Sequence, residues 1–298
     1  MAIIGTDLYI GGSFYSIGGL PKKQIARWNG TEWSDLGGIG GIYPEVLTFA
    51  VIGSDLYVGG KFTSAGQIAA KNIARWDGTS WSALGDGTDN VVYALLADGS
   101  NLYAGGSFIR ASGVEVRSIA RWDGAAWSSL GGGVNGQVWA LASDGSNVYA
   151  GGLFDAAGGK QARNIARWNG HTWATLGSGL DNPVSTLATI GSTLYVGGGG
   201  GDLTTINGLP SGPAIGWDGT SWLRLGNNIA IYVSVLTVFD SQLYAAGAFN
   251  FQPGITTYGV GRWNGTSWAA IGDNISSSYA NLLVTNSTIY IGGKFIMA

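Results

Sequence analysis

Cysteine is absent from this 298-residue chain, and histidine occurs once, as His171. Without cysteine there is no disulfide, no thiolate nucleophile and no sulfur-ligated metal. A single histidine cannot build the zinc or copper sites that need several nitrogen or sulfur ligands. It follows Asn169-Gly170 in an expected tight turn, which gives no support to a Ser-His-Asp arrangement. We therefore expect no catalytic residues, no metal, no cofactor and no enzymatic activity.

Charge is also scarce, because Asp, Glu, Lys and Arg make up 11% of the residues and the formal net charge is −3. A nucleic-acid-binding protein carries a basic field that this balance does not supply. No apolar run approaches the roughly 18 residues of a membrane span. The first residues, Met1-Ala-Ile-Ile, do not begin a signal peptide. We expect no nucleic-acid partner and no insertion into a membrane.

Tryptophan, by contrast, is abundant and regularly spaced. The chain holds 13, and twelve of them form six pairs whose members lie five residues apart. The pairs recur at steps of 46 to 49 residues, and a fixed period of about 40–50 residues is typical of propellers with four-stranded blades. No helical period competes with this interpretation. The pairs are Trp28/Trp33, Trp76/Trp81, Trp122/Trp127, Trp168/Trp173, Trp217/Trp222 and Trp263/Trp268.

Each period reads as four short strands, A to D. Strand A is seen in Val92–Ala97, strand B in Leu56–Phe62, and strand C in the Ile-Ala-Arg-Trp string at 73–76. Asp-Gly or Asn-Gly then predicts a two-residue hairpin turn into strand D, because both turn positions need positive φ. Paired glycines such as Gly59-Gly60 are poor strand residues and indicate the close approach of a neighbouring group. We expect the paired tryptophans and the strand-B tyrosine to form the core between blades.

The number of strands bears on how the ring closes. The chain holds six C, six D and six full A strands, but seven B strands. We expect one all-β domain over residues 1–298, a β-propeller of four-stranded antiparallel blades, with six blades preferred. In this ring the last blade would combine two strands from each end of the chain. The last A (279–285) and B (289–295) strands would pair with the first C and D strands, and residues 1–12 would be an extra copy outside the blades. The alternative is a seven-position ring with one incomplete blade.

Antiparallel order places the B–C and D–A loops on one face of the blades and the tight turns on the other. The variable residues concentrate on the B–C/D–A face, where loops are free to carry function. Four aromatic residues there are the candidate ligand-binding residues: Tyr43, Tyr93, Trp139 and Tyr232. Aromatic platforms suit sugar rings or other flat apolar surfaces. The alternative is that they fill the central channel or pack between blades.

Two repeated polar residues have structural explanations. Strand C carries an arginine in five of the six periods, for example Arg75 and Arg121. A guanidinium beside tryptophan can stack on it and bond to carbonyls, and one copy in nearly every blade favours that role over ligand binding. The Asp or Asn after the first tryptophan, as in Asp77 and Asp123, is explained by the hairpin turn rather than by calcium.

The string Leu-Tyr-Val-Gly-Gly-x-Phe, continued by Asn-Ile-Ala-Arg-Trp-Asp-Gly-Thr-x-Trp-x-x-Leu-Gly, resembles the kelch-like repeats of bacterial surface and secreted proteins. It is also similar to the repeat of the fungal Rax2-type cell-polarity markers. The match covers nearly the whole chain. The resemblance implies a propeller scaffold on or outside the cell, and it carries over no catalytic residues. The copper enzyme of the kelch class, galactose oxidase, needs cysteine and histidines that this chain lacks.

Together these observations favour a non-catalytic binding or scaffold propeller, extracellular or on the cell surface, that binds a protein or polymer through the B–C/D–A face. One alternative is a lectin with aromatic pockets, and another is a designed or excised repeat with no natural ligand. A polysaccharide lyase or hydrolase would need clustered charged groups, which are missing from the pattern. We expect a monomer, with a strand-exchanged oligomer as the alternative because of the surplus B strand.

Overall fold

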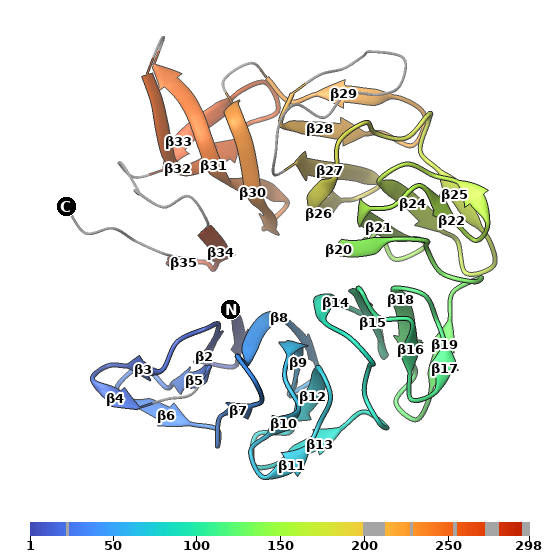
Figure 1. The fold of residues 1–298 in the computed structure, drawn as a ribbon. Coiled ribbons are helices and arrows are strands. Elements are labelled where there is room, and N and C mark those ends of the chain that lie inside the picture. The colour runs from blue at the N-terminus through green and yellow to red at the C-terminus, as the bar shows by residue number, and fades with distance from the viewer. Residues whose placement is uncertain (22–23, 199–211, 227–228, 253–254, 272–279, 294–298) are drawn as a thin grey trace. The chain divides into compact units, whose positions relative to one another are not determined.

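Strands make up the regular structure of this chain. The computed structural model describes residues 1–298 except 22–23, 199–211, 227–228, 253–254, 272–279 and 294–298. No helix occurs in this described part, and therefore none that is long and apolar enough to cross a membrane. The chain divides into two compact units, 1–138 and 139–298, each described by itself (Figure 1). The single domain expected from the repeat stays a prediction.

Three four-stranded antiparallel sheets form the first unit, each in the order A to D. They are β1 (Ala2–Ile4), β2 (Asp7–Gly11), β5 (Ile25–Trp28) and β6 (Trp33–Asp35); β8 (Glu45–Ile52), β9 (Asp55–Lys61), β12 (Ile73–Trp76) and β13 (Trp81–Ala83); β14 (Val92–Asp98), β15 (Asn101–Gly106), β18 (Ile119–Trp122) and β19 (Trp127–Ser129). Small hairpins occupy the B–C loops: β3 (Ser16–Ile17) with β4 (Leu20–Pro21), β10 (Ser64–Ala65) with β11 (Ile68–Ala69) and β7 (Ile39–Gly40), and β16 (Arg110–Ala111) with β17 (Val114–Glu115).

Three more sheets of the same order belong to the second unit. They are β20 (Gln137–Ser143), which begins just before the boundary, with β21 (Val148–Leu153), β24 (Ile165–Trp168) and β25 (Trp173–Thr175); β26 (Val184–Ile190), β27 (Thr193–Gly198), β28 (Ala214–Trp217) and β29 (Trp222–Arg224); β30 (Ile229–Phe239), β31 (Gln242–Gln252), β32 (Ile255–Trp263) and β33 (Trp268–Ile271). Two hairpins complete it: β22 (Ala156–Ala157) with β23 (Lys160–Gln161), and β34 (Ala280–Val284) with β35 (Ile289–Gly293).

The C–D turns form as the sequence predicted. Asp77 Oδ1 accepts hydrogen bonds from the backbone N–H groups of Thr79 and Ser80, each at 2.8 Å, and both hydroxyls also donate to this carboxylate. These bonds favour the ionised form and hold the pKa of Asp77 well below its usual range. Gly78 has a φ of 99°, in the region that favours glycine. The carboxylate is thus used by the turn, as inferred from the sequence.

The space between neighbouring sheets is filled by the strand-B tyrosines and the apolar residues around them. In the first unit Tyr9 packs with Val46 of the next sheet, and Tyr57 packs with Val92 of the sheet after that. In the second unit Tyr149 packs in the same way. These three tyrosines are 3–7% exposed. Burying one large side chain contributes roughly 1.5–3 kcal/mol, so these layers confirm the predicted core between sheets.

In four sheets the first glycine of the strand-B pair, at Gly11, Gly59, Gly151 and Gly197, gives room to the next sheet. A Cβ added at Gly59 would lie 2.7 Å from Cγ1 of Val92, which belongs to the following strand A. A Cβ added at Gly151 would lie 2.5 Å from Cγ1 of Val184. Real Cβ atoms do not approach other carbons so closely, because interiors are packed to crystal density. The close approach predicted from the paired glycines is confirmed.

The second tryptophan of a pair links its sheet to the sheet before it. Trp127 Nε1 donates to the carbonyl oxygen of Leu84, and Trp268 Nε1 donates to that of Leu225, each at 3.0 Å. Each leucine directly follows the preceding strand D, so the indole N–H satisfies a carbonyl just beyond the ladder. Within each pair the two indoles pack tilted, with ring centroids 5.0–5.5 Å apart.

The preferred closure of the ring is corrected by the strand pairing. We expected the first C strand, β5, to pair with the last B strand, but β5 pairs with β2, and β1 completes that sheet. The strands β34 and β35 pair with each other. This corresponds to the alternative with six complete sheets and one incomplete one. The first and last B strands, β2 and β35, carry the same motif. Strand β5 pairs with β2, which is nearer in the sequence, because closing a short loop costs less entropy. Residues 279, 294 and 295 of the predicted last strands lie outside the described residues.

The B–C loops are more regular than the sequence analysis anticipated. Their small hairpins lie against the outermost strands: β11 against β13, β17 against β19, and β23 against β25. In the second sheet the turn of the hairpin contacts the outer tryptophan, since a Cβ added at Gly66 would lie 2.8 Å from Trp81 Cδ1. An uncovered outer strand is a template for unwanted pairing. The loops therefore protect the sheet edges as well as form a surface.

Candidate binding face

Exposed large hydrophobic side chains gather in the B–C and D–A connections, which we call the loop face of each unit. In the described part of the chain, eight such side chains are exposed, and six lie in these connections or at their edges. The other two lie on strands: Leu223 on strand D and Tyr258 on strand C of the sixth sheet. A contiguous exposed apolar surface marks an interaction site more often than a scattered one. The six are Tyr15, Ile42, Tyr43, Ile109, Val114 and Leu153.

The most exposed of them are adjacent residues in the first D–A connection. Ile42 is 82% exposed and Tyr43 is 80% exposed. Tyr43 has a φ of 51°, a left-handed conformation that is uncommon for a residue other than glycine. Tyr15, in the first B–C loop of the same unit, is 71% exposed. Strained backbone of this kind clusters at ligand-binding and switch regions. Tyr43 is one of the four candidates predicted from the sequence, whereas Ile42 is not among them.

Tyr93 is placed differently from Tyr43, although both belong to the first unit. It is half-buried on β14, and its hydroxyl oxygen lies 3.5 Å from Ser107 Oγ. The pairing register shifts between Val92 and Ala94, so Tyr93 is the extra residue of a β-bulge. Bulges bend a strand and re-aim a side chain, commonly beside functional sites. The predicted candidate Tyr93 is therefore a bulge residue of strand A.

The remaining two candidates belong to the second unit. Trp139 is half-buried on β20. Tyr232, on β30, packs against Tyr258 of β32 with ring centroids 6.3 Å apart and planes inclined at 42°. Tyr258 is 40% exposed, and the sequence analysis missed it. The available signal was the length of the apolar and aromatic runs there, since β30 and β31 each have 11 residues. The four candidates thus fall two in each unit.

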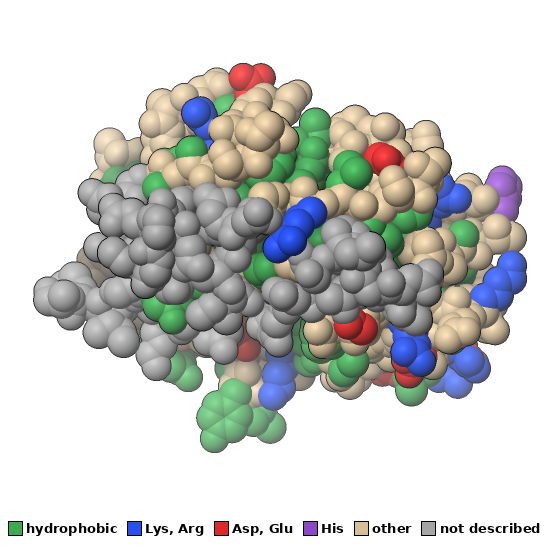
Figure 2. Space-filling view, turned by 90° about the horizontal axis from the view of Figure 1, so that it is seen from above, with side chains coloured by type: hydrophobic (Ala, Val, Ile, Leu, Met, Phe, Trp, Pro, Cys, Tyr) green, Lys and Arg blue, Asp and Glu red, His purple; other side chains and the backbone are tan. Residues whose placement is uncertain are grey.

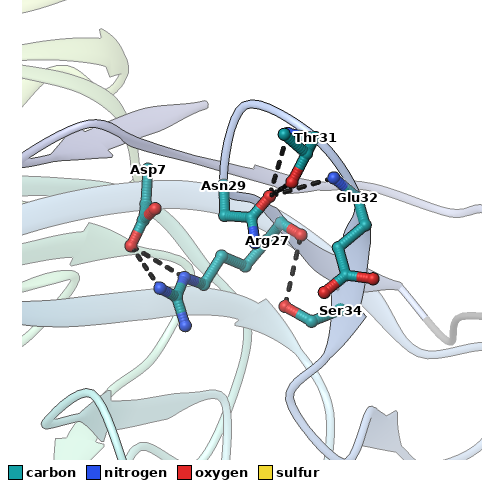
Figure 3. A network of polar contacts seen from close by, with 6 residues as sticks. All are labelled: Asp7, Arg27, Asn29, Thr31, Glu32 and Ser34. Atoms are coloured by element: carbon teal, nitrogen blue, oxygen red, sulfur yellow. Dashed lines mark hydrogen bonds and ion pairs between the residues drawn. The ribbon is translucent and has the colours of Figure 1, made fainter.

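Two strand-C arginines form ion pairs within their own sheets, a structural role other than the predicted stacking on tryptophan and bonding to carbonyls. Arg27 bonds to Asp7 through Nε at 2.8 Å and through Nη2 at 2.6 Å (Figure 3). Arg75 makes the same pair with Asp55, at 2.8 and 2.7 Å. Each pair joins strand C to the start of strand B within one sheet. The side chains are one-fifth to two-fifths exposed, which limits such a pair to a modest contribution.

Asn101→Asp is expected to stabilise the third sheet slightly. Asn101 occupies the place that Asp7 and Asp55 hold in the first two sheets, and Nε of Arg121 is buried without a hydrogen-bond partner. The new carboxylate would supply that partner and raise the free energy of unfolding by about 0.5 kcal/mol at low salt. Urea denaturation at low and high salt measures it, with Asp55→Asn as the reciprocal variant that loses a similar amount. A gain that is unchanged in 1 M salt would contradict the ion-pair explanation.

Charge does not define a site. Figure 2 shows Lys, Arg, Asp and Glu side chains dispersed over the face in view, without a large patch of one sign. Within the described residues there is no group of three or more His, Asp or Glu side chains that could hold a metal ion. A groove of about 300 Å³ lies between β23 and β25. Trp173, the aromatic residue in its lining, is only 4% exposed and so offers a partner little contact area. Apolar loop residues are therefore the best-supported contacts for a partner.

Comparisons with known proteins identify the architecture. No family model matches the chain, and no curated protein matches its sequence. The WD40 β-propeller domain of Doa1 matches with a TM-score of 0.62 and 12% identity, over 98% of this chain and 88% of that one. The extracellular domain of the putative one-component system BT4673 from B. thetaiotaomicron matches with a TM-score of 0.59 and 12% identity. That match spans 98% of this chain and 38% of the matched domain.

A third similar structure is the computationally designed Ika8 protein, with a TM-score of 0.57 and 15% identity over 91% of this chain and 74% of that one. At such identities the likeness concerns the fold alone. With the sheets described above, it makes the chain an all-β protein of the β-propeller class, as the repeat predicted. The resemblance to kelch-like and Rax2-type repeats is a finer assignment and stays a prediction.

Proposed function

We propose that this chain is a non-catalytic binding or scaffold propeller, displayed on or outside the cell, that holds a protein or polymer partner on its loop face. The observation that carries the proposal is the placement of the exposed large hydrophobic side chains: six of eight in the described residues belong to that face. Loops on a rigid scaffold are the usual place for recognition. The B–C hairpins keep this surface in one shape before binding, which lowers the entropy cost of association.

The chemistry of the surface indicates the kind of partner. Ile42 and Tyr43 offer apolar and aromatic contact area, and the chain is only 11% charged. Interfaces of this composition obtain affinity from a few large anchors rather than from ion pairs. One structural neighbour is itself an extracellular domain, and the kelch-like resemblance points to display outside the cell as well. We therefore propose that the partner is a protein or polymer found outside the cell.

The double variant Ile42→Ser/Tyr43→Ser is expected to lower partner binding about tenfold or more while leaving the fold intact, since both side chains are exposed and hot-spot anchors carry most of the affinity. The measurement is surface capture of extracellular proteins and polysaccharides by immobilised chain, followed by titration of the captured ligand. Leu223→Ser is the matched control, because Leu223 is exposed on strand D away from the loop face. Equal losses in both variants, or none in either, would remove the loop face from the proposal.

A second candidate function is carbohydrate binding, and one observation favours it. Tyr232 and Tyr258 form a tilted aromatic pair, and Tyr258 is 40% exposed. Aromatic faces of this kind can hold sugar rings. A glycan array, probed with and without calcium, is the discriminating arm of the same experiment. Saturable binding that Tyr258→Ala abolishes and Ile42→Ser/Tyr43→Ser leaves unchanged would replace the first proposal with the second.

A further inference from the structure

The hairpin of β34 and β35 is a half-built sheet. It contains strands A and B, paired over five residues from Ala280↔Gly293 to Val284↔Ile289. In each of the six complete sheets, strand B has a strand C on its other side. Among the residues that the structure describes, no strand pairs with that side of β35. The N–H and C=O groups along such an edge are a ready template for another strand.

The half-built sheet is held in the position of a blade. Ile289 and Ile291 of β35 pack against the cluster that contains Ala246 and Val260 of the neighbouring sheet. The residue equivalent to Ile291 in the second sheet, Val58, is fully buried, whereas Ile291 is only half-buried. Burial at this position varies between sheets, since Ile10 of the first sheet is also half-buried although strand C pairs with it. One face of β35 is packed, while the edge that strand C would cover is open in the described residues. The hairpin is therefore ordered in advance for one more strand.

The repeat specifies which strand fits. In the first four sheets, strand B pairs with Ile-Ala-Arg-Trp in one register: the tyrosine lies opposite the arginine, and the residue before it lies opposite the tryptophan. The open edge of β35 continues this interface, since Ile289, Tyr290 and Ile291 repeat the strand-B pattern. A strand-C segment would place its arginine opposite Tyr290 and its alanine opposite Ile291. Main-chain bonds supply affinity in such strand addition, and the register supplies specificity.

The chain itself offers the most accessible such segment, the β5–β6 hairpin. Its strand B, β2, is joined to a strand A of three residues, paired at three positions, whereas β8 and β9 pair at seven. Moving β5 from β2 to β35 would exchange four paired residues for four. Exchanging identical elements between copies is a low-cost route to a dimer. We propose that two copies of this chain form a strand-exchanged dimer in which the β5–β6 hairpin of each completes the β34–β35 sheet of the other.

Engineered cysteines test this pairing, because the chain has none of its own. In the proposed register Ala26 lies opposite Ile291, whereas in the sheet described here it lies opposite Ile10. Oxidation of Ala26→Cys/Ile291→Cys is expected to give a covalent dimer, with mass spectrometry showing position 26 linked to 291 between isotopically distinct copies. The matched control, Ala26→Cys/Ile10→Cys, should give a disulfide within a monomer. Monomer only, a 26–291 bond within one copy, or 291–291 links would each overturn the proposal.

The unmodified chain provides a second measurement that does not depend on the folding of a variant. Sedimentation over a concentration series is expected to show a dimer whose fraction rises with concentration. A synthetic peptide of Ile25–Leu36 should compete for the edge of β35 and lower that fraction, while a scrambled peptide should not. A chain that stays monomeric at every concentration, or a dimer that the peptide leaves unchanged, would overturn the exchange. This inference does not depend on the proposed function, because the loop face is not the surface that it uses.

Discussion

Gly247→Ala is expected to lower the free energy of unfolding by about 3 kcal/mol, the upper end of what overpacking costs. Gly247 lies in β31, and a Cβ built there would be 2.3 Å from the carbonyl oxygen of Tyr232 and 3.1 Å from Cα of Val233. Both are backbone atoms of the paired strand β30, so no side chain can rotate away to make room. Relief would require parting the two strands at the bulge that the register shift between Val233 and Val235 marks.

The matched control lies directly across the sheet. Gly259 of β32 is the Cα partner of Gly247, and a Cβ built there has nothing within 4 Å. Gly259→Ala is expected to stay within about 1 kcal/mol of the parent or to stabilise it, because alanine lowers the entropy of the unfolded chain. Urea denaturation followed by tryptophan fluorescence measures both variants. Similar midpoints for the two would show that the strands part easily and that the close approach is not required.

The repeat itself supports this expectation. At the second glycine position of strand B all seven copies are glycine, whereas at the first position the sixth copy has Ala246. The structure explains the difference in physical terms. The first position faces the side chain of the next sheet, as Gly59 faces Val92, and a side chain can be changed to make room. At the second position a Cβ would collide with a backbone oxygen in or just before strand A at Gly60, Gly106 and Gly247, whereas at Gly12 it would meet no backbone atom. A backbone atom cannot be changed by substitution, so the second glycine is the harder one to replace in those three sheets.

The layers between sheets could be predicted because they repeat. Tyr57, Trp76 and Trp81 recur at fixed spacing, and only packing between equivalent sheets asks for the same residue at every copy. The strand closure could not be predicted in the same way. Leu8–Gly11 and Ile289–Gly292 present the same pattern to a strand C, so the motif does not distinguish them. Chain connectivity decides which B strand pairs with β5. It favours the partner nearer in the sequence, and the side-chain pattern does not reveal it.

The B–C hairpins were missed although the sequence contained a signal. Gly18-Gly19, Ser112-Gly113 and Gly158-Gly159 sit at two-residue turns whose residues all have positive φ. Such pairs between short strands are typical of hairpin turns, but strands of two residues carry no alternation that would reveal them. The candidate site was only partly accessible for a related reason. The exposure of Tyr43 could be predicted because Tyr43 lies in a loop. The orientation of Tyr93 depends on a β-bulge, and no residue type in the sequence predicts that shift of strand register.

Trp268→Phe is expected to destabilise the protein by about 2 kcal/mol more than Trp222→Phe does. The two tryptophans are equivalent second members of their pairs, and both keep a tilted partner, Trp263 at 5.4 Å and Trp217 at 5.0 Å. Both substitutions remove a similar volume. They differ in the indole N–H, because Trp268 Nε1 bonds to the carbonyl of Leu225 at 3.0 Å while Trp222 Nε1 is buried without a partner.

The sign of the difference follows from what each variant leaves behind. Trp268→Phe leaves the carbonyl of Leu225 unpaired between two sheets, and such a group costs about 1–3 kcal/mol. Trp222→Phe removes a donor that is already unpaired, so the lost packing is partly offset by relief of a desolvation penalty. Denaturant unfolding of both variants, each against the parent, gives the difference directly. If both lost the same amount, the indole would act by volume alone, and the link from Trp268 to the preceding sheet would contribute little to holding neighbouring sheets together.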